Sequence, residues 1–110
     1  MTDKTSSTVK ENTMAIQDLV IDTASHEVRL GQSDINLTLI EFNLLLMLAR
    51  KRGQVVRRAE LIQEIWGSRE LMSDRTINVH VCRLRKKIEA HPKYPSRIVL
   101  VRDVGYKLSN

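Results

Sequence analysis

The sequence has few of the residues that mark secreted, metal-binding or membrane proteins. Cys82 is the only cysteine among 110 residues, which excludes a disulfide framework and a cysteine-based zinc site and fits a reducing cytosol. No run approaches the ~20 apolar residues that a membrane span requires. Residues 1–13 also lack the apolar core of a secretory signal. We therefore expect a cytoplasmic protein.

Aromatic residues are scarce, so the core must be mainly aliphatic. The chain is long enough for one compact domain. Residues 1–13 are rich in Ser, Thr, Lys, Asp and Glu, which is typical of a flexible leader or interdomain linker. Residues 14–110 are then expected to form the folded domain.

The positive charge is concentrated in the last third of the chain. The net charge is +5, yet residues 73–110 hold nine Lys or Arg against three acids, whereas residues 1–72 hold nine against ten. This asymmetry favours a polyanionic partner that docks at one end of the molecule. Charge alone does not separate DNA from RNA or an anionic membrane.

The apolar pattern predicts an α+β fold. Alternating residues predict strands over 15–22 and 27–30, with a turn at 31–32 and a third short strand over 35–37. Thr38 and Glu41 have capping-box spacing and predict the start of a helix that ends at Gly53. Two further helices are expected over 58–66 and 73–91, and strands over 98–102 and 106–108 form a final hairpin through 103–105.

The helix over 73–91 carries the strongest functional signal. With Ile77 at zero and 100° per residue, the apolar residues share one narrow stripe: Ile77, Val81, Leu84 and Ile88. The opposite face carries three cations and no acid near its centre: Arg75, Thr76, Val79, Cys82, Arg83 and Lys86. Two interpretations fit this face, a solvated surface that happens to be basic or a face that enters a DNA major groove.

Nothing in the sequence indicates an enzyme, a cofactor or a metal site. It contains no glycine-rich phosphate loop, no paired carboxylates in a plausible pocket and no nucleophile beside a base. His80 and Cys82 point about 160° apart on one helix, which excludes a Cys–His pair there.

Several segments together resemble the DNA-binding effector domain of OmpR/PhoB-family response regulators, a winged helix-turn-helix. The matching segments are LTLIEFNLLLMLARKRGQVVRRAELIQEIWG, SDRTINVHVCRLRKKIE and IVLVRDVGYKL. They cover most of residues 37–108 in order and spacing, and the preceding strands fit the family's N-terminal antiparallel sheet.

The resemblance implies sequence-specific binding of double-stranded DNA for bacterial transcription regulation in a two-component phosphorelay, with no membrane partner. The helix over 73–91 would enter the major groove, and the hairpin over 98–108, the wing, would touch the minor groove. Family members typically bind direct repeats as dimers, and an N-terminal receiver domain and a sensor kinase supply the signal. The loop before the recognition helix resembles one that can face RNA polymerase: Gly67, Ser68, Arg69, Glu70, Leu71 and Met72.

Base contacts are predicted for three residues of the helix and one of the wing: Thr76, Val79, Arg83 and Arg102. Arginine can pair bidentately with guanine, and a β-branched side chain on a polar face suits a thymine methyl group. The alternatives are a solvated Arg83 and a Val79 that packs against the wing or a neighbouring loop.

Phosphate contacts are predicted for six residues: Arg75, His80, Arg85, Lys86, Trp66 and Tyr106. Four of these six residues have an alternative role. Arg85 could instead form a salt bridge, His80 could be a partly buried core histidine, Trp66 could be mostly core, and Tyr106 could pack under the hairpin.

Three positions depart from the family pattern. Arg58 stands where relatives usually have a Ser or Thr cap, which leaves the start of the second helix unexplained. Cys82 stands where relatives often carry a cation, and Asp103 replaces a small residue, often glycine. A carboxylate at 103 could orient Arg102 or repel phosphate. A second class of function, a winged helix whose basic face meets an acidic protein, stays open at this point.

Overall fold

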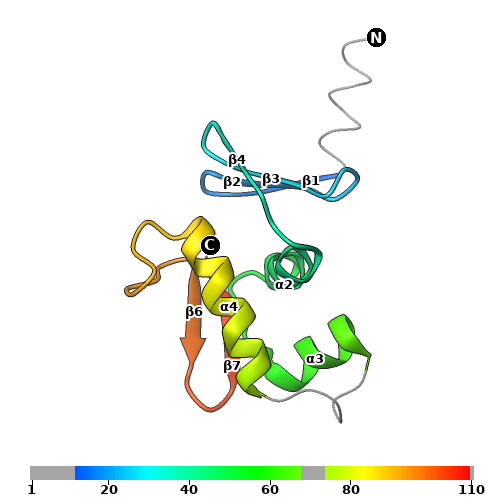
Figure 1. Cartoon of the computed structure of the whole chain (residues 1–110), viewed down its shortest axis with the longest axis vertical. Coiled ribbons are helices and arrows are strands. Elements are labelled where there is room, and N and C mark those ends of the chain that lie inside the picture. Colours follow the sequence, from blue (N-terminus) through cyan, green and yellow to red (C-terminus); the bar gives the residue numbers. More distant parts are fainter. Residues whose placement is uncertain (1–11, 68–73, 110) are drawn as a thin grey trace. The chain divides into compact units, whose positions relative to one another are not determined.

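The computed structural model describes residues 12–67 and 74–109, and its elements follow the predicted α+β order (Figure 1). The chain divides into two compact units, one ending at Asn36 and the other running from Leu37 to Asn110. Most of the predicted leader, residues 1–11, lies outside the described residues.

The first unit is an antiparallel sheet in the order β1-β2-β3-β4. Its strands are β1 (Thr13–Ile16), β2 (Leu19–Asp22), β3 (Glu27–Leu30) and β4 (Ser33–Ile35). The expectation of a single strand over 15–22 is wrong, because the chain turns at residues 17–18, where Gln17 has a φ of 57°. Two consecutive polar residues break the alternation there, and two residues suffice for a hairpin turn.

The described residues of the second unit form three helices and a three-stranded sheet in the order β5-β7-β6. The helices are α2 (Leu39–Arg50), α3 (Arg58–Trp66) and α4 (Asp74–Ile88), and the strands are β5 (Val56–Arg57), β6 (Ile98–Val101) and β7 (Gly105–Leu108). The three predicted helices and the hairpin are confirmed. Helix α4 ends three residues before the expected boundary.

Helix α2 begins where the capping box predicts. The Glu41 N–H donates to Thr38 Oγ1 at 3.2 Å, and the Thr38 N–H donates to Glu41 Oε1 at 3.0 Å. The helix ends at Arg50, and Gly53 follows with a left-handed φ of 81°. The Gly53 N–H donates to the Leu108 carbonyl at 2.8 Å, so this turn ties the end of α2 to β7.

The apolar stripe of α4 is buried as predicted. Ile77, Val81 and Leu84 have no exposed surface and Ile88 is 1% exposed. Because one face of α4 is fixed in the core in this way, the opposite face is turned to the surface.

Gly105 belongs to strand β7 and not to the turn that the sequence predicted. It lies opposite Arg57, and a Cβ atom at this position would come 2.0 Å from the Val56 carbonyl oxygen. Only glycine therefore lets β5 and β7 approach closely enough to pair. This contact anchors the C-terminal hairpin to the helices.

Candidate nucleic-acid interface

Helix α4 presents one continuous strip of side chains to the surface. We define the α4 strip as Arg75, Thr76, Val79, Cys82, Arg83 and Lys86; all are exposed except Thr76, which is half-buried. Val79 is 42% exposed, although it is apolar. The alternative for Val79, packing against the wing or a neighbouring loop, would cover this side chain more fully. Its base contact stays a prediction.

The side of α4 that faces α3 is closed by two aromatic rings. The centroids of Trp66 and His80 lie 5.6 Å apart, with the planes tilted by 45°. Both side chains are half-buried, which matches the expected partly buried histidine. Their phosphate contacts stay predictions.

The other side of α4 meets the C-terminal hairpin through Tyr106. This side chain is only 4% exposed, and its hydroxyl donates a hydrogen bond to Asn78 Oδ1 on α4. The guanidinium groups of Arg58 and Arg85 lie 5.2 and 5.5 Å from the centre of its ring. Tyr106 thus links α4, α3 and β7, and a phosphate contact would require its hydroxyl to exchange Asn78 for DNA.

The N-cap of α3 is Arg57 and not Arg58, the position expected from the family pattern, and no side chain caps the helix there. The sequence did not predict the contact of the Arg58 guanidinium with the Tyr106 ring or the hydrogen bond of Asn78. A signal for Asn78 was available, since asparagine inside a helix is unfavourable without a compensating contact.

Arg85 reaches β6, and among the described residues it does not form the salt bridge that the sequence allowed as an alternative. Its Nε and Nη2 atoms donate to the Ile98 carbonyl oxygen at 3.1 and 2.9 Å. Of the five N–H donors of the guanidinium group, two on Nη1 and one on Nη2 are left over for the predicted phosphate contact, which stays a prediction.

The sequence did not predict the role of Glu89. It follows the last residue of α4, is 8% exposed, and accepts hydrogen bonds from three consecutive backbone N–H groups. These belong to Ser96, Arg97 and Ile98. An acid at a helix C-terminus opposes the helix dipole, and that unfavourable placement was the one signal in the sequence.

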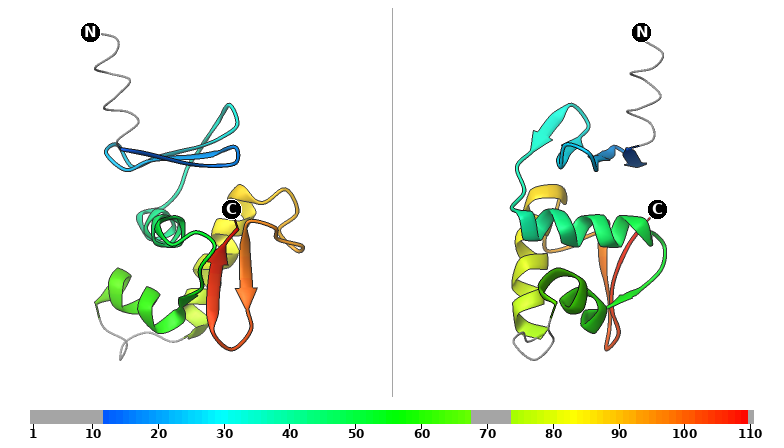
Figure 2. Two further views of the ribbon diagram at one scale, coloured as in Figure 1. Left: turned by 180° about the vertical axis from the view of Figure 1, so that it is seen from behind. Right: turned by 90° about the vertical axis from the view of Figure 1, so that its right-hand side faces the viewer.

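The turn of the hairpin carries the predicted wing residues. Arg102, Asp103 and Val104 are exposed, and Asp103 has a φ of 65°. This left-handed conformation explains why glycine suits the position, and aspartate is one of the few other residues that tolerate it. The turn lies at the same end of the unit as the first turns of α4 in all three views (Figures 1 and 2).

The predicted polymerase-facing loop is described only at Gly67. This residue caps α3 in the left-handed conformation, with a φ of 76°. Residues 68–72 of that prediction lie outside the described residues.

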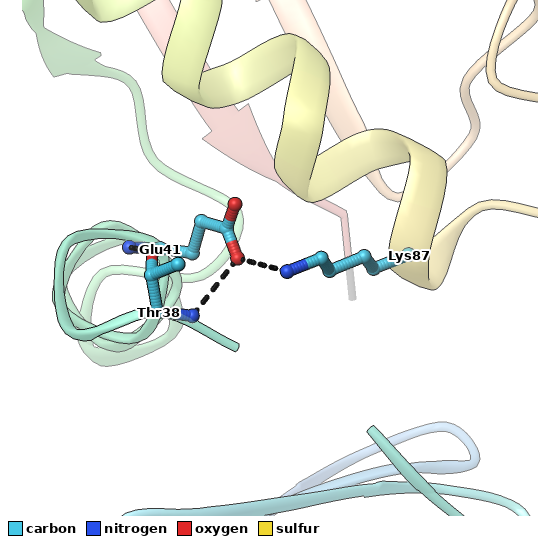
Figure 3. Close-up of polar contacts among 3 residues, drawn as sticks. All are labelled: Thr38, Glu41 and Lys87. Carbon is cyan, nitrogen blue, oxygen red and sulfur yellow. Dashed lines mark hydrogen bonds and ion pairs between the residues drawn. The ribbon is translucent and has the colours of Figure 1, made fainter. Parts of the chain in front are cut away.

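An ion pair between the half-exposed Lys87 and the buried Glu41 fixes the C-terminal half of α4 against α2 (Figure 3). Lys87 Nζ donates to Glu41 Oε1 at 2.7 Å, on the same oxygen that accepts the Thr38 N–H. Burial of the Glu41 carboxyl by itself raises its pKa, but the hydrogen bonds from Lys87 and Thr38 outweigh burial, and the pKa is lowered from its usual value.

Two kinds of site are missing from residues 12–67 and 74–109. No group of three His, Cys, Asp or Glu side chains there could hold a metal ion. Within the same residues, no helix is long and apolar enough to cross a membrane.

A helix pair, a third helix with an exposed basic strip and a C-terminal hairpin beside it define a winged helix-turn-helix domain. The family described as "Transcriptional regulatory protein, C terminal" matches residues 31–108. The chain therefore belongs to this family, the effector domains of OmpR/PhoB-type response regulators, and the predicted resemblance is confirmed.

Curated relatives agree. The chain is 45% identical over 94 residues to the DNA-binding response regulator MtrA of Mycolicibacterium paratuberculosis, covering 86% of this chain and 42% of that protein. It is 44% identical over 88 residues to the sensory transduction protein RegX3 of Mycobacterium bovis, covering 80% and 39%. The chain thus spans about two-fifths of the length of these relatives.

Solved structures show the same fold. The response regulator DrrB of Thermotoga maritima, an OmpR/PhoB homologue, superposes with a TM-score of 0.83 at 33% identity, over 90% of this chain and 45% of that one. The RstA DNA-binding domain of Klebsiella pneumoniae, solved in complex with the RstA box, gives a TM-score of 0.81 at 34% identity, over 88% and 96%.

Proposed function

We propose that this chain is the DNA-binding output domain of a two-component transcription regulator. Helix α4 would enter the major groove, and the turn between β6 and β7 would reach the adjacent minor groove. The carrying observation is the α4 strip, because it combines exposed cations with an exposed β-branched side chain while the other three sides of α4 are in contact with the protein. The similar RstA domain was solved on its DNA box.

The proposed readout divides the strip by chemistry. Arg83, Thr76 and Val79 would contact base edges, and Arg102 would contact the minor groove. Arg75 and Lys86 would neutralise phosphates, with further phosphate contacts from His80, Arg85, Trp66 and Tyr106. Phosphate contacts position the domain, whereas base contacts select the sequence.

The wider setting of the proposal follows from the relatives. Their names describe DNA-binding and sensory transduction proteins, not enzymes. We propose that the chain binds direct-repeat DNA as a homodimer in the cytoplasm. The further proposed partners are RNA polymerase, contacted through the 67–72 loop, and a receiver domain that a sensor kinase phosphorylates. The residues before β1 would act as linker or leader, and the rest as the effector domain; Thr13, placed in the leader from the sequence, belongs to β1.

The first test is selection of bound sites from random double-stranded DNA. An enriched motif with two half-sites in direct repeat supports the proposal, because half-site spacing reports how two copies lie on DNA. Failure to enrich any motif, together with binding to an acidic protein, would instead favour the protein-contact interpretation of the basic strip.

Two variants then separate base readout from phosphate contact. Arg83→Ala is expected to remove the preference for the selected motif over random DNA, while Lys86→Ala weakens binding to both similarly. If the domain neutralises about five phosphates, log K falls with log salt at a slope of about −4.5, and Lys86→Ala reduces the slope by about 0.9. Equal losses on both DNAs for both variants would contradict the role of Arg83.

A further inference from the structure

The first residue of β6 is held by α4 at both of its backbone groups. The Ile98 N–H donates to Glu89 Oε2 at 2.8 Å, and the Ile98 carbonyl accepts from Arg85 at 2.9 Å. Arg85 and Glu89 are four residues apart, so they lie on adjacent turns of the same side of the chain. Ile98 itself has no exposed surface, and its hydrogen bond to Glu89 is buried, whereas the one from Arg85 is partly buried.

Glu89 also binds the backbone of the two residues before β6. Its Oε1 atom accepts from the Ser96 and Arg97 N–H groups at 3.0 and 3.1 Å, and its Oε2 atom also accepts from Arg97 at 3.0 Å. Three successive backbone N–H groups that converge on one carboxylate form an anion-binding nest. Hydrogen bonds to an ionised acceptor are roughly twice as strong as neutral ones, so a neutral amide would be a poor replacement.

We propose that Glu89 is a positioning residue for the wing: with Arg85 it fixes the start of β6 against α4, and thereby sets where Arg102 lies relative to the base-contacting strip. This inference rests on the proposed DNA-binding function. Strand β6 runs from the clamped Ile98 to Val101, and Arg102 follows directly. A shift of the strand at its start would therefore displace the turn that carries Arg102.

The clamp can be tested without DNA. In the Glu89→Gln variant, one carboxylate oxygen becomes an NH₂ group that faces N–H donors, so the nest loses acceptors. Amide hydrogen exchange of Ser96, Arg97 and Ile98 is expected to accelerate, and residual dipolar couplings should report a changed orientation of β6 and β7 relative to α4. Glu64→Gln, the same substitution at an exposed position on α3, is the control and should leave both measurements unchanged.

The consequence for DNA is measured by a double-mutant cycle on the selected motif. Arg102→Ala is expected to weaken binding about tenfold in the wild-type background, in the range of a lost base contact. In the Glu89→Gln background the same substitution should cost only about twofold, because Arg102 no longer lies in register with the groove. A role limited to stability would lower the melting temperature and leave the tenfold cost intact.

The outcomes separate the inference from the proposed function. No motif binding by the wild type contradicts the proposed function, whereas the exchange and orientation measurements still test the clamp. Wild-type binding with the same cost of Arg102→Ala in both backgrounds overturns the positioning role. If Glu89→Gln fails to fold, Glu89→Asp keeps the charge on a shorter side chain, and an undiminished cost of Arg102→Ala there overturns it equally.

Discussion

The ion pair between Glu41 and Lys87 offers the sharpest test of how α4 is held in place. The buried carboxylate of Glu41 makes two contacts. It completes the capping box of α2, and it forms an ion pair with Lys87 of α4. Glu41→Ala removes both functions. Glu41→Gln removes the charge but keeps an oxygen that can accept the Thr38 N–H, since glutamine also fits a capping box.

The structure sets the expected size of each effect. A lost cap costs about 1 kcal/mol. The side chains of Glu41 and Lys87 are 3% and 36% exposed, so the pair falls between a surface pair, worth about 0–1 kcal/mol, and a fully buried one, whose disruption costs about 3–5 kcal/mol. We expect a loss of about 2–3 kcal/mol for Glu41→Ala and about 1–2 kcal/mol for Glu41→Gln, because half-exposed Lys87 regains water.

The assay is urea unfolding followed by Trp66 fluorescence, which reports on the unit from Leu37 to Asn110. Because the pKa of folded Glu41 is lowered from 4.5, its charge contributes stability that is fully present above that value. The contribution is lost as the pH falls through the lower pKa of the folded state. The difference in unfolding free energy between wild type and Glu41→Gln should thus be constant from about pH 6 to 7 and shrink toward about pH 3.

The matched control is the Glu60–Lys51 ion pair between α3 and the end of α2. Its side chains are 38% and 46% exposed, so Glu60→Gln should cost about 0.5 kcal/mol or less. A wild-type minus Glu41→Gln difference that is the same at pH 3 and pH 7 would refute the charged pair. So would a Lys87→Met substitution that costs as much in the Glu41→Gln background as in wild type, because the two effects would then be independent.

Two further predictions concern the hairpin. Gly105→Ala places a Cβ atom 2.0 Å from the Val56 carbonyl oxygen, so β5 and β7 must separate. We expect the free energy of unfolding, measured by heat or urea, to fall by more than about 3 kcal/mol. A smaller loss would show that the two strands can separate easily. Asp103→Asn keeps a residue that tolerates the left-handed conformation but removes a negative charge beside Arg102. It should leave stability unchanged and strengthen motif binding severalfold in a titration at fixed salt, whereas weaker binding would mean that Asp103 orients Arg102.

Helix phase was the part of the structure most readable from the sequence. The stripe from Ile77 to Ile88 is buried and the opposite strip is exposed, because 3.6-residue periodicity places every side chain once the helix exists. The capping box at Thr38 was equally local, since its two hydrogen bonds join residues three apart. The boundaries of strands were predicted less well than those of helices, as the missed turn at residues 17–18 shows. Two adjacent polar residues are compatible both with a turn and with a strand whose alternation is imperfect.

Contacts between distant residues could not be predicted in the same way. The Tyr106 hydroxyl meets an amide 28 positions earlier, and Lys87 meets an acid 46 positions away. No periodicity links such pairs, and both partners look like ordinary surface residues until the helices are packed. Glu89 is harder still, because it binds backbone N–H groups, which every residue except proline offers.

The packing of α4 also predicts where the interface can change at little cost. The helix is in contact with the core on one side, with Trp66 on the second and with Tyr106 and Ile98 on the third, so substitutions there alter stability as well as binding. Cys82 lies on the exposed α4 strip, so a substitution there does not disturb these packing contacts. We therefore expect Cys82→Arg to leave the unfolding free energy within about 0.5 kcal/mol of wild type. The added cation should steepen the salt slope of DNA binding by about 0.9, and an unchanged slope would place Cys82 away from the phosphates.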